Sequence, residues 1–80
     1  MDRKNLNRLK IVLAETNHTN KWLAEQMNIG QATVSKWVTN SSQPSLEQLL
    51  KIAEVLQVPY TDLIRAEITA KQDATILENG

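Results

Sequence analysis

Residues 19–38 decide how this chain folds, and they read TNKWLAEQMNIGQATVSKWV. Thr19 is a favourable N-cap residue, so a short helix is expected to begin directly after it. The positions of this helix that point inward are apolar or small: Leu23, Ala24 and Met27.

A tight turn and another short helix follow. Residues 28–30 (NIG) are too few for anything but a turn, and Asn28 and Gly30 both tolerate unusual dihedral angles. Residues 31–38 then place small or apolar side chains at helical spacing, at Ala32, Val34, Trp37 and Val38. Two helices joined by so short a connection predict a helix-turn-helix unit.

A helix is also expected before this unit, over residues 5–16. Its apolar side chains recur at helical spacing, at Leu6, Leu9, Val12 and Leu13. Asn17 is expected to end this helix in the left-handed conformation.

Two more helices are predicted after the unit. Residues 40–44 (NSSQP) form a polar loop closed by proline, and Ser45 with Gln48 makes a capping box that opens the fourth helix. The apolar stripe of this helix comprises Leu46, Leu49, Leu50, Ala53 and Leu56. Pro59 cannot continue the helix, and Thr61 is expected to cap a short fifth one.

These elements predict an all-α, five-helix domain over residues 1–65, with no strand before Ala66. Eighty residues are enough for one such domain. Residues 66–80 show weak periodicity and end polar, so we expect a flexible tail. A tail that becomes ordered against a partner is the alternative.

Composition limits the chemistry that the chain can carry. It has no cysteine and one histidine, so neither a disulfide nor a metal site is expected. No apolar run approaches the roughly 20 residues that a bilayer span needs, and the first residues do not resemble a signal segment. We therefore expect a soluble, cytoplasmic protein.

The charge is balanced, which is unusual for a protein that binds nucleic acid. Nine basic and nine acidic residues give a formal net charge of zero. Residues 1–60 nevertheless carry seven Lys and Arg against five acids, while residues 61–80 carry two against four. We expect few phosphate contacts and weak non-specific affinity for DNA.

Three runs of this sequence resemble the phage-repressor-like helix-turn-helix family, the XRE family of Cro and lambda repressor. They are residues 22–37 (WLAEQMNIGQATVSKW), 43–53 (QPSLEQLLKIA) and 58–64 (VPYTDLI), and the resemblance covers roughly residues 5–65. It implies a lambda-repressor-like fold in which the third helix enters the major groove of DNA. Thr39-Asn40 departs from the Asn-Gly that is usual in the family after this helix.

The resemblance also implies which residues contact DNA. Base contacts are expected from Gln31, Ala32, Thr33 and Lys36, and phosphate contacts from Asn20, Lys21, Asn40, Ser41, Ser42 and Gln43. The side-chain chemistry agrees with the base contacts. Gln can form a bidentate contact with adenine, Lys can reach O6 and N7 of guanine, and the methyl groups of Ala and Thr can pack on that of thymine.

Several other side chains have a structural interpretation. Trp37 falls on the inward face of its helix and is expected in the core, whereas Trp22 either covers the edge of the core or lines the DNA surface. His18 is expected to pack or to be solvated. No acid or serine lies beside a suitable base at catalytic spacing, so we expect neither enzymatic activity nor a cofactor.

Two functions follow from these observations. The first is a transcriptional regulator that binds double-stranded DNA as a homodimer. Its dimer surface would use apolar residues at the end of the chain: Val55, Tyr60, Ile64, Ile68, Ile76 and Leu77. The second is a protein-interaction module, for example an antitoxin-like partner whose tail folds on another protein, which the neutral charge and acidic tail favour.

Overall fold

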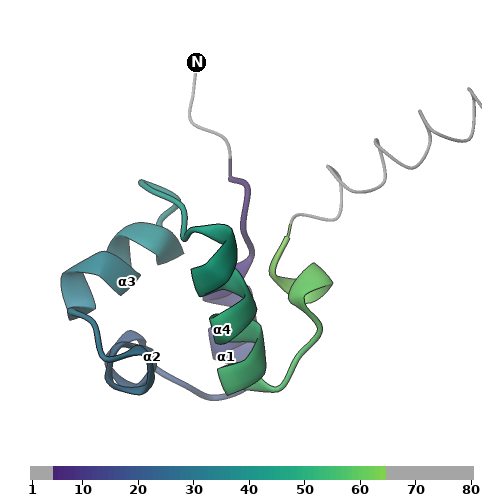
Figure 1. Ribbon diagram of the computed structural model, residues 1–80, viewed down its shortest axis with the longest axis horizontal. Helices are drawn as coiled ribbons and strands as arrows, with labels where there is room; N and C mark the ends of the chain where they lie inside the picture. Colours follow the sequence, from purple (N-terminus) through teal and green to yellow (C-terminus); the bar gives the residue numbers. More distant parts are fainter. Residues whose placement is uncertain (1–4, 65–80) are drawn as a thin grey trace, which may run out of the picture.

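The chain forms an all-α domain, as predicted, with four α-helices and a 3-10 turn over the part of the chain that is described. A computed structural model describes residues 5–64 (Figure 1), and the predicted tail of residues 66–80 lies outside this range. The elements are α1 Leu9–Glu15, α2 Asn20–Met27, α3 Gln31–Val38, α4 Leu46–Leu56 and the 3-10 turn η1 Tyr60–Leu63.

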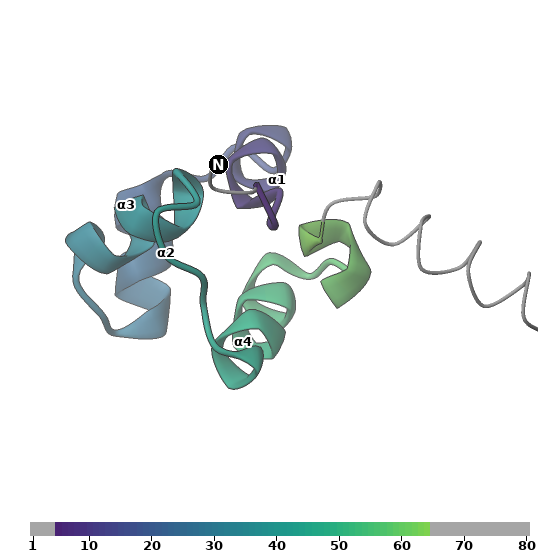
Figure 2. The ribbon, with the colours of Figure 1, turned by 90° about the horizontal axis from the view of Figure 1, so that it is seen from above.

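The five elements pack in a closed ring, in which each element packs mainly against two others. Helix α2 contacts α3 and α4, α1 contacts α3 and η1, and η1 contacts α4. In Figure 2, α1 and α4 lie on two sides of the domain, α2 and α3 lie together at one end, and η1 lies at the other. The helix-turn-helix therefore forms one end of the domain, supported by the remaining elements.

One hydrophobic core holds these short helices together. Helices of this length are marginal in isolation, so their stability must come from packing. Each large side chain that is fully buried stabilises the fold by roughly 1.5–3 kcal/mol. The buried apolar residues come from every element: Leu9, Val12, Leu13, Leu23, Ala24, Val34, Trp37, Ile52, Ala53, Leu56 and Leu63.

Two predicted helix caps are confirmed. The Thr19 hydroxyl accepts a hydrogen bond from the backbone N–H of Trp22 at 3.0 Å. Ser45 and Gln48 form the full capping box, in which each side chain accepts a hydrogen bond from the other residue's backbone N–H. The starts of α2 and α4 are thus encoded locally.

The corners between helices use asparagine and glutamine in the left-handed conformation. Positive φ angles occur at Asn17 (61°), Asn28 (58°), Asn40 (60°) and Gln57 (59°). The expectation for Asn17 and Asn28 is confirmed. Gly30 also tolerates such angles but does not use one, because its φ of −76° is open to any residue.

The first helix begins later than predicted, at Leu9 and not at residue 5. The side-chain oxygen of Asn7 accepts a hydrogen bond from the N–H of Leu9 at 2.9 Å, and Asn7 pairs with Ile64 in an isolated antiparallel β-bridge. These contacts hold Asn7 outside the helix. Leu6, which the helical pattern placed on the apolar stripe, is 41 % exposed as a result.

The buried face of α4 agrees with the prediction at Ala53 and Leu56 and differs from it at other positions. Leu46 and Leu50 are 71 % and 48 % exposed, whereas Ile52 is fully buried beside Ala53 and Leu56. The periodic pattern admits both faces, and contact with α2 and η1 selects the one that contains Ile52.

The predicted fifth helix is a 3-10 turn of four residues, Tyr60–Leu63. It follows Pro59, without the expected side-chain cap from Thr61. The turn brings Leu63 into the core, where that residue is fully buried. Its anchor is therefore an apolar contact and not a cap.

None of the helices within residues 5–64 is both long enough and apolar enough to span a bilayer.

Candidate nucleic-acid interface

Helix α3 has two chemically distinct faces. Val34 and Trp37 are 0 % and 2 % exposed, which confirms Trp37 as a core residue. All four residues predicted to contact bases are exposed, and Ser35 is exposed as well. Together these residues form the outer face of α3: Gln31, Ala32, Thr33, Ser35 and Lys36. The outer face of α3 is therefore polar or small and free of the core.

The turn before α3 sets the direction in which this face points. The N–H of Ile29 donates to the carbonyl of Ala24 at 3.0 Å, and the half-buried Ile29 side chain packs against the core. The carbonyl of Gly30 accepts hydrogen bonds from the N–H groups of Thr33 and Val34. Backbone hydrogen bonds and one apolar side chain thus fix α3 relative to α2.

The start of α2 presents the first group of predicted phosphate contacts. Lys21 is exposed and Asn20 is half-buried, in the first turn after the Thr19 cap. Trp22 is also half-buried and packs against the core. Its ring stacks on His18, with 3.6 Å between ring centroids and 8° between planes, so Trp22 covers the edge of the core and His18 packs.

The loop after α3 presents the second group. Ser41 and Ser42 are exposed, and their backbone N–H groups both donate to the carbonyl of Lys36, at 2.8 and 3.2 Å. The hydroxyls of Thr39 and Ser41 lie 2.8 Å apart and share a hydrogen bond. The end of α3 is therefore continuous with an ordered loop that carries the two serines outward.

The side chain of Asn40 lies in a different environment from the two serines. The residue is only 6 % exposed, and its side-chain oxygen accepts hydrogen bonds from the backbone N–H of Asn7 and from the Gln43 amide, both at 3.0 Å. Its side-chain nitrogen donates to the carbonyl of Asn7 at 3.2 Å. Gln43 is exposed, but its amide group takes part in the same contacts.

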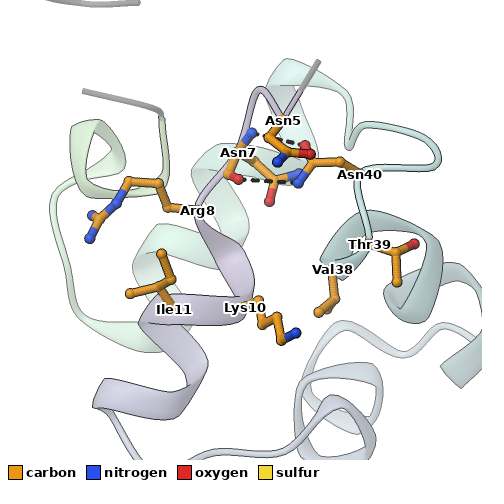
Figure 3. A pocket seen from close by; sticks show the side chains of 8 residues that line it. All are labelled: Asn5, Asn7, Arg8, Lys10, Ile11, Val38, Thr39 and Asn40. Atoms are coloured by element: carbon orange, nitrogen blue, oxygen red, sulfur yellow. Dashed lines mark hydrogen bonds between the residues drawn. The ribbon is translucent and has the colours of Figure 1, made fainter. Parts of the chain in front are cut away.

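Asn7 is the residue that sequence reasoning missed. It is 8 % exposed, and its side-chain nitrogen donates to the carbonyl of Trp37 at 3.0 Å and to the Gln43 oxygen at 2.8 Å. Figure 3 shows Asn7 and Asn40 facing each other between the start of α1 and the end of α3. Nothing in the local pattern singles out this residue, because its partners other than Leu9 lie 30 or more positions away.

A hollow of about 490 Å³ lies beside this contact and is lined partly by basic side chains. Lys10 from α1 lies on one side, and Val38 and Thr39 from the end of α3 lie on the other (Figure 3). Arg8 also lines the hollow, and its guanidinium donates to the carbonyl of Asp62 at 2.8 Å. The exposed Lys10 therefore places a positive charge on the side of the hollow opposite the end of α3.

Comparison with known proteins agrees with this geometry. A helix-turn-helix family model matches residues 9–63, which is more than half of the chain. The chain belongs to the XRE-type helix-turn-helix family of Cro and lambda repressor. This family membership establishes a DNA-binding type of domain.

One solved structure is closely similar to this member of the family. It is the crystal structure of a candidate DNA-binding protein from Bacteroides fragilis, which is 55 % identical to this chain with a TM-score of 0.74. The match covers 75 % of this chain and 97 % of the other. No curated protein matches the chain.

Proposed function

We propose that this protein is a sequence-specific transcriptional regulator that reads the major groove of double-stranded DNA with the outer face of α3. The proposal rests on the two faces of α3. The four residues predicted to contact bases are exposed on one face, and Val34 and Trp37 anchor the other face in the core. A recognition helix needs this combination of a rigid support and a free face.

The outer face of α3 offers three kinds of base contact. The Gln31 amide can bind the N6 and N7 edge of adenine, and Lys36 can reach O6 and N7 of guanine. The methyl groups of Ala32 and Thr33 can pack on the thymine methyl group. Each good bidentate contact discriminates against a wrong base by roughly 1–3 kcal/mol, so this short helix can specify a few base pairs.

Phosphate contacts are proposed at both ends of the helix-turn-helix. Asn20 and Lys21 lie at the start of α2, and Ser41 and Ser42 lie in the loop after α3, where the hydroxyl groups of these exposed serines suit phosphate oxygens. The family pattern also places Asn40 and Gln43 in this group, but their amide groups bond within the protein, so we leave them out of the proposed phosphate contacts. Such contacts set the register of the protein on the duplex and carry no sequence information themselves.

Operator selection from random duplexes, followed by binding measurements on one variant and its control, tests this proposal. Lys36→Ala should weaken binding to the selected duplex by about 5- to 150-fold and relax the preference at one position. Lys51→Ala changes an exposed lysine of α4 and should leave base preference unchanged. The proposal is contradicted if no sequence is enriched and the amide resonances of residues 31–36 stay still when a mixed-sequence duplex is added at low salt.

We propose further that the regulator binds DNA as a homodimer, with half-sites one helical turn, roughly 34–36 Å, apart. Of the predicted dimer surface, Tyr60 is 51 % exposed and Val55 and Ile64 are half-buried. Ile68, Ile76 and Leu77 lie outside the described residues. Sedimentation of a chain truncated after Arg65 tests this dimer surface, because a truncated chain that stays dimeric excludes residues 66–80 from it.

The cytoplasmic location stays a prediction.

A second candidate function is a protein-interaction module, such as an antitoxin-like partner. The observation that favours it is the exposure of two leucines on α4, Leu46 and Leu50, at 71 % and 48 %. Two exposed apolar side chains one helical turn apart on the same helix suit a protein partner. A duplex titration without response, together with a partner whose binding is lost in Leu46→Asp, would favour this function over the first.

A further inference from the structure

The amide groups of Asn7, Asn40 and Gln43 form one connected set of hydrogen bonds, which we call the amide network. It joins the segment before α1 to the end of α3 and to the loop before α4, parts of the chain separated by 30 to 36 positions. Asn7 and Asn40 are the only polar residues that are buried among residues 5–64. The set is therefore an exception in a core that is otherwise apolar.

Hydrogen bonds satisfy the buried parts of the amide network. Among residues 5–64, no buried side-chain nitrogen or oxygen lacks a hydrogen-bond partner. Hydrogen bonds are directional, so a buried set of polar groups that are all hydrogen-bonded holds one geometry. Apolar contacts tolerate small displacements. The network is therefore suited to fixing an orientation.

The network holds the segment where the recognition helix ends. Asn7 donates to the carbonyl of Trp37 in the last turn of α3, and Asn40 follows α3 in the left-handed conformation. Asn40 and Gln43 stand on either side of Ser41 and Ser42, and the amides of both residues bond to Asn7. The two serines are thus carried on a short loop that is anchored at both ends.

We propose that Asn7, Asn40 and Gln43 are positioning residues for DNA binding, which hold the end of α3 and the serine loop at the angle that the duplex requires. This inference rests on the proposed function. It assigns Asn40 and Gln43 an indirect role in place of phosphate contact, because their amide groups are already engaged within the protein. Asn7 is buried at 8 % exposure and acts on DNA only through the end of α3 and the serine loop, to which it bonds.

A double-mutant cycle distinguishes positioning from direct contact. Asn40→Gly removes the amide while keeping a residue that adopts a φ of 60° without strain. Asn7→Ala removes the side-chain bonds to Trp37 and Gln43 and leaves the Asn7 backbone in place. Each change should weaken binding to the selected duplex by about tenfold, and the double variant should lose no more than either single one. Independent phosphate contact by Asn40 would instead make the losses multiply, and would overturn the inference.

Asn28→Gly is the matched control. Asn28 has a φ of 58° in the turn of the helix-turn-helix, is exposed, and takes no part in the network. This variant should bind DNA like the wild type. An equal loss in Asn28→Gly and Asn40→Gly would show that the side-chain network is not the cause, and would also overturn the inference.

Amide hydrogen exchange of the free proteins separates this inference from the proposed function. Asn40→Gly should speed exchange at Ser41 and Ser42 while the core amides of α2 stay protected. Faster exchange combined with wild-type affinity would overturn the positioning role. Failure of the wild type to bind any duplex would instead contradict the proposed function, and the positioning role would fall with it.

Gln43→Ala provides a test in case the buried variants do not fold. Gln43 is exposed, so its truncation removes two hydrogen bonds of the network without opening a cavity in the core. We expect faster exchange at Ser42 and a loss of affinity in the same direction as for Asn40→Gly. Unchanged exchange together with unchanged affinity would overturn the inference.

Discussion

The two ends of α3 are held by different kinds of interaction. At its start, a three-residue turn is fixed by backbone hydrogen bonds and by Ile29 packing against the core. At its end, the amide network ties Asn40 and the carbonyl of Trp37 to Asn7, more than 30 positions away in the sequence. The start of the helix is therefore held mainly by local contacts, and the end by distant ones.

This difference has an energetic consequence. Apolar packing at the start is non-directional, and its contribution scales with buried area. In the amide network, loss of one residue leaves its partners without a hydrogen bond. Each buried group left unsatisfied lowers the free energy of unfolding by about 1–3 kcal/mol. We therefore expect core truncations to affect stability most, and network changes to affect the geometry of the DNA-binding surface more than stability.

The largest effect is expected from Leu23→Ala, which truncates a fully buried side chain of α2 in the core. The lost transfer free energy and the cavity left behind should lower the free energy of unfolding by about 2–5 kcal/mol. Urea unfolding followed by far-UV circular dichroism measures this change. Leu46→Ala is the control, because that side chain is 71 % exposed and its truncation should cost less than about 0.5 kcal/mol.

A smaller loss is expected from Asn7→Ala at the other end of α3. The change removes the donor to the carbonyl of Trp37 and the acceptor for the N–H of Leu9, and should cost about 1–3 kcal/mol. The same urea titration detects it. Asn5→Ala, at an exposed position two residues earlier, should leave the midpoint unchanged, and equal effects of the two variants would contradict the role given to the network.

Asn28→Ala should cost about 1 kcal/mol, because alanine adopts the left-handed conformation at φ 58° less readily than asparagine. For a domain of this size, that loss corresponds to a fall in Tm of roughly 4–8 °C. Thermal unfolding followed by circular dichroism measures it. A variant as stable as the wild type would indicate that the turn before α3 tolerates other conformations.

The smallest effect, and a stabilising one, is expected from Gly30→Ser. Gly30 has a φ of −76°, a Cβ built there meets no atom within 4 Å, and the residue is the N-cap of α3. Serine restricts the unfolded chain and can cap the helix, so the free energy of unfolding should rise by about 0.5–1 kcal/mol. A fall in Tm would show that the turn before α3 needs the conformational freedom of glycine at this position.

Part of the candidate interface could be predicted because it depends on near neighbours. The cap at Thr19, the capping box of Ser45 and Gln48, and the turn at Asn28 involve residues no more than four positions apart. The outer face of α3 follows from helical periodicity once Trp37 is placed inside. The angle that Gly30 adopts could not be predicted, because glycine permits a left-handed angle without requiring one.

The face of α4 and the start of α1 could not be predicted in this way. An amphipathic pattern with leucine at four positions admits two faces, and only contact with α2 and η1 buries Ile52 in place of Leu46 and Leu50. Leu6 does lie at helical spacing from the apolar residues of α1. The residue nevertheless lies outside α1, because Asn7 is held by the bridge to Ile64.

The helix-turn-helix, its caps and the polar face of α3 therefore follow from the sequence, because each depends on hydrogen bonds and periodicities within a few residues. Tertiary structure alone decided what holds the far end of α3. Asn7, Asn40 and Gln43 are ordinary polar residues in the sequence, and only the packing of α1 beside α3 brings their amides within hydrogen-bond distance. Burial then makes these bonds consequential, because water can no longer replace a partner that is lost.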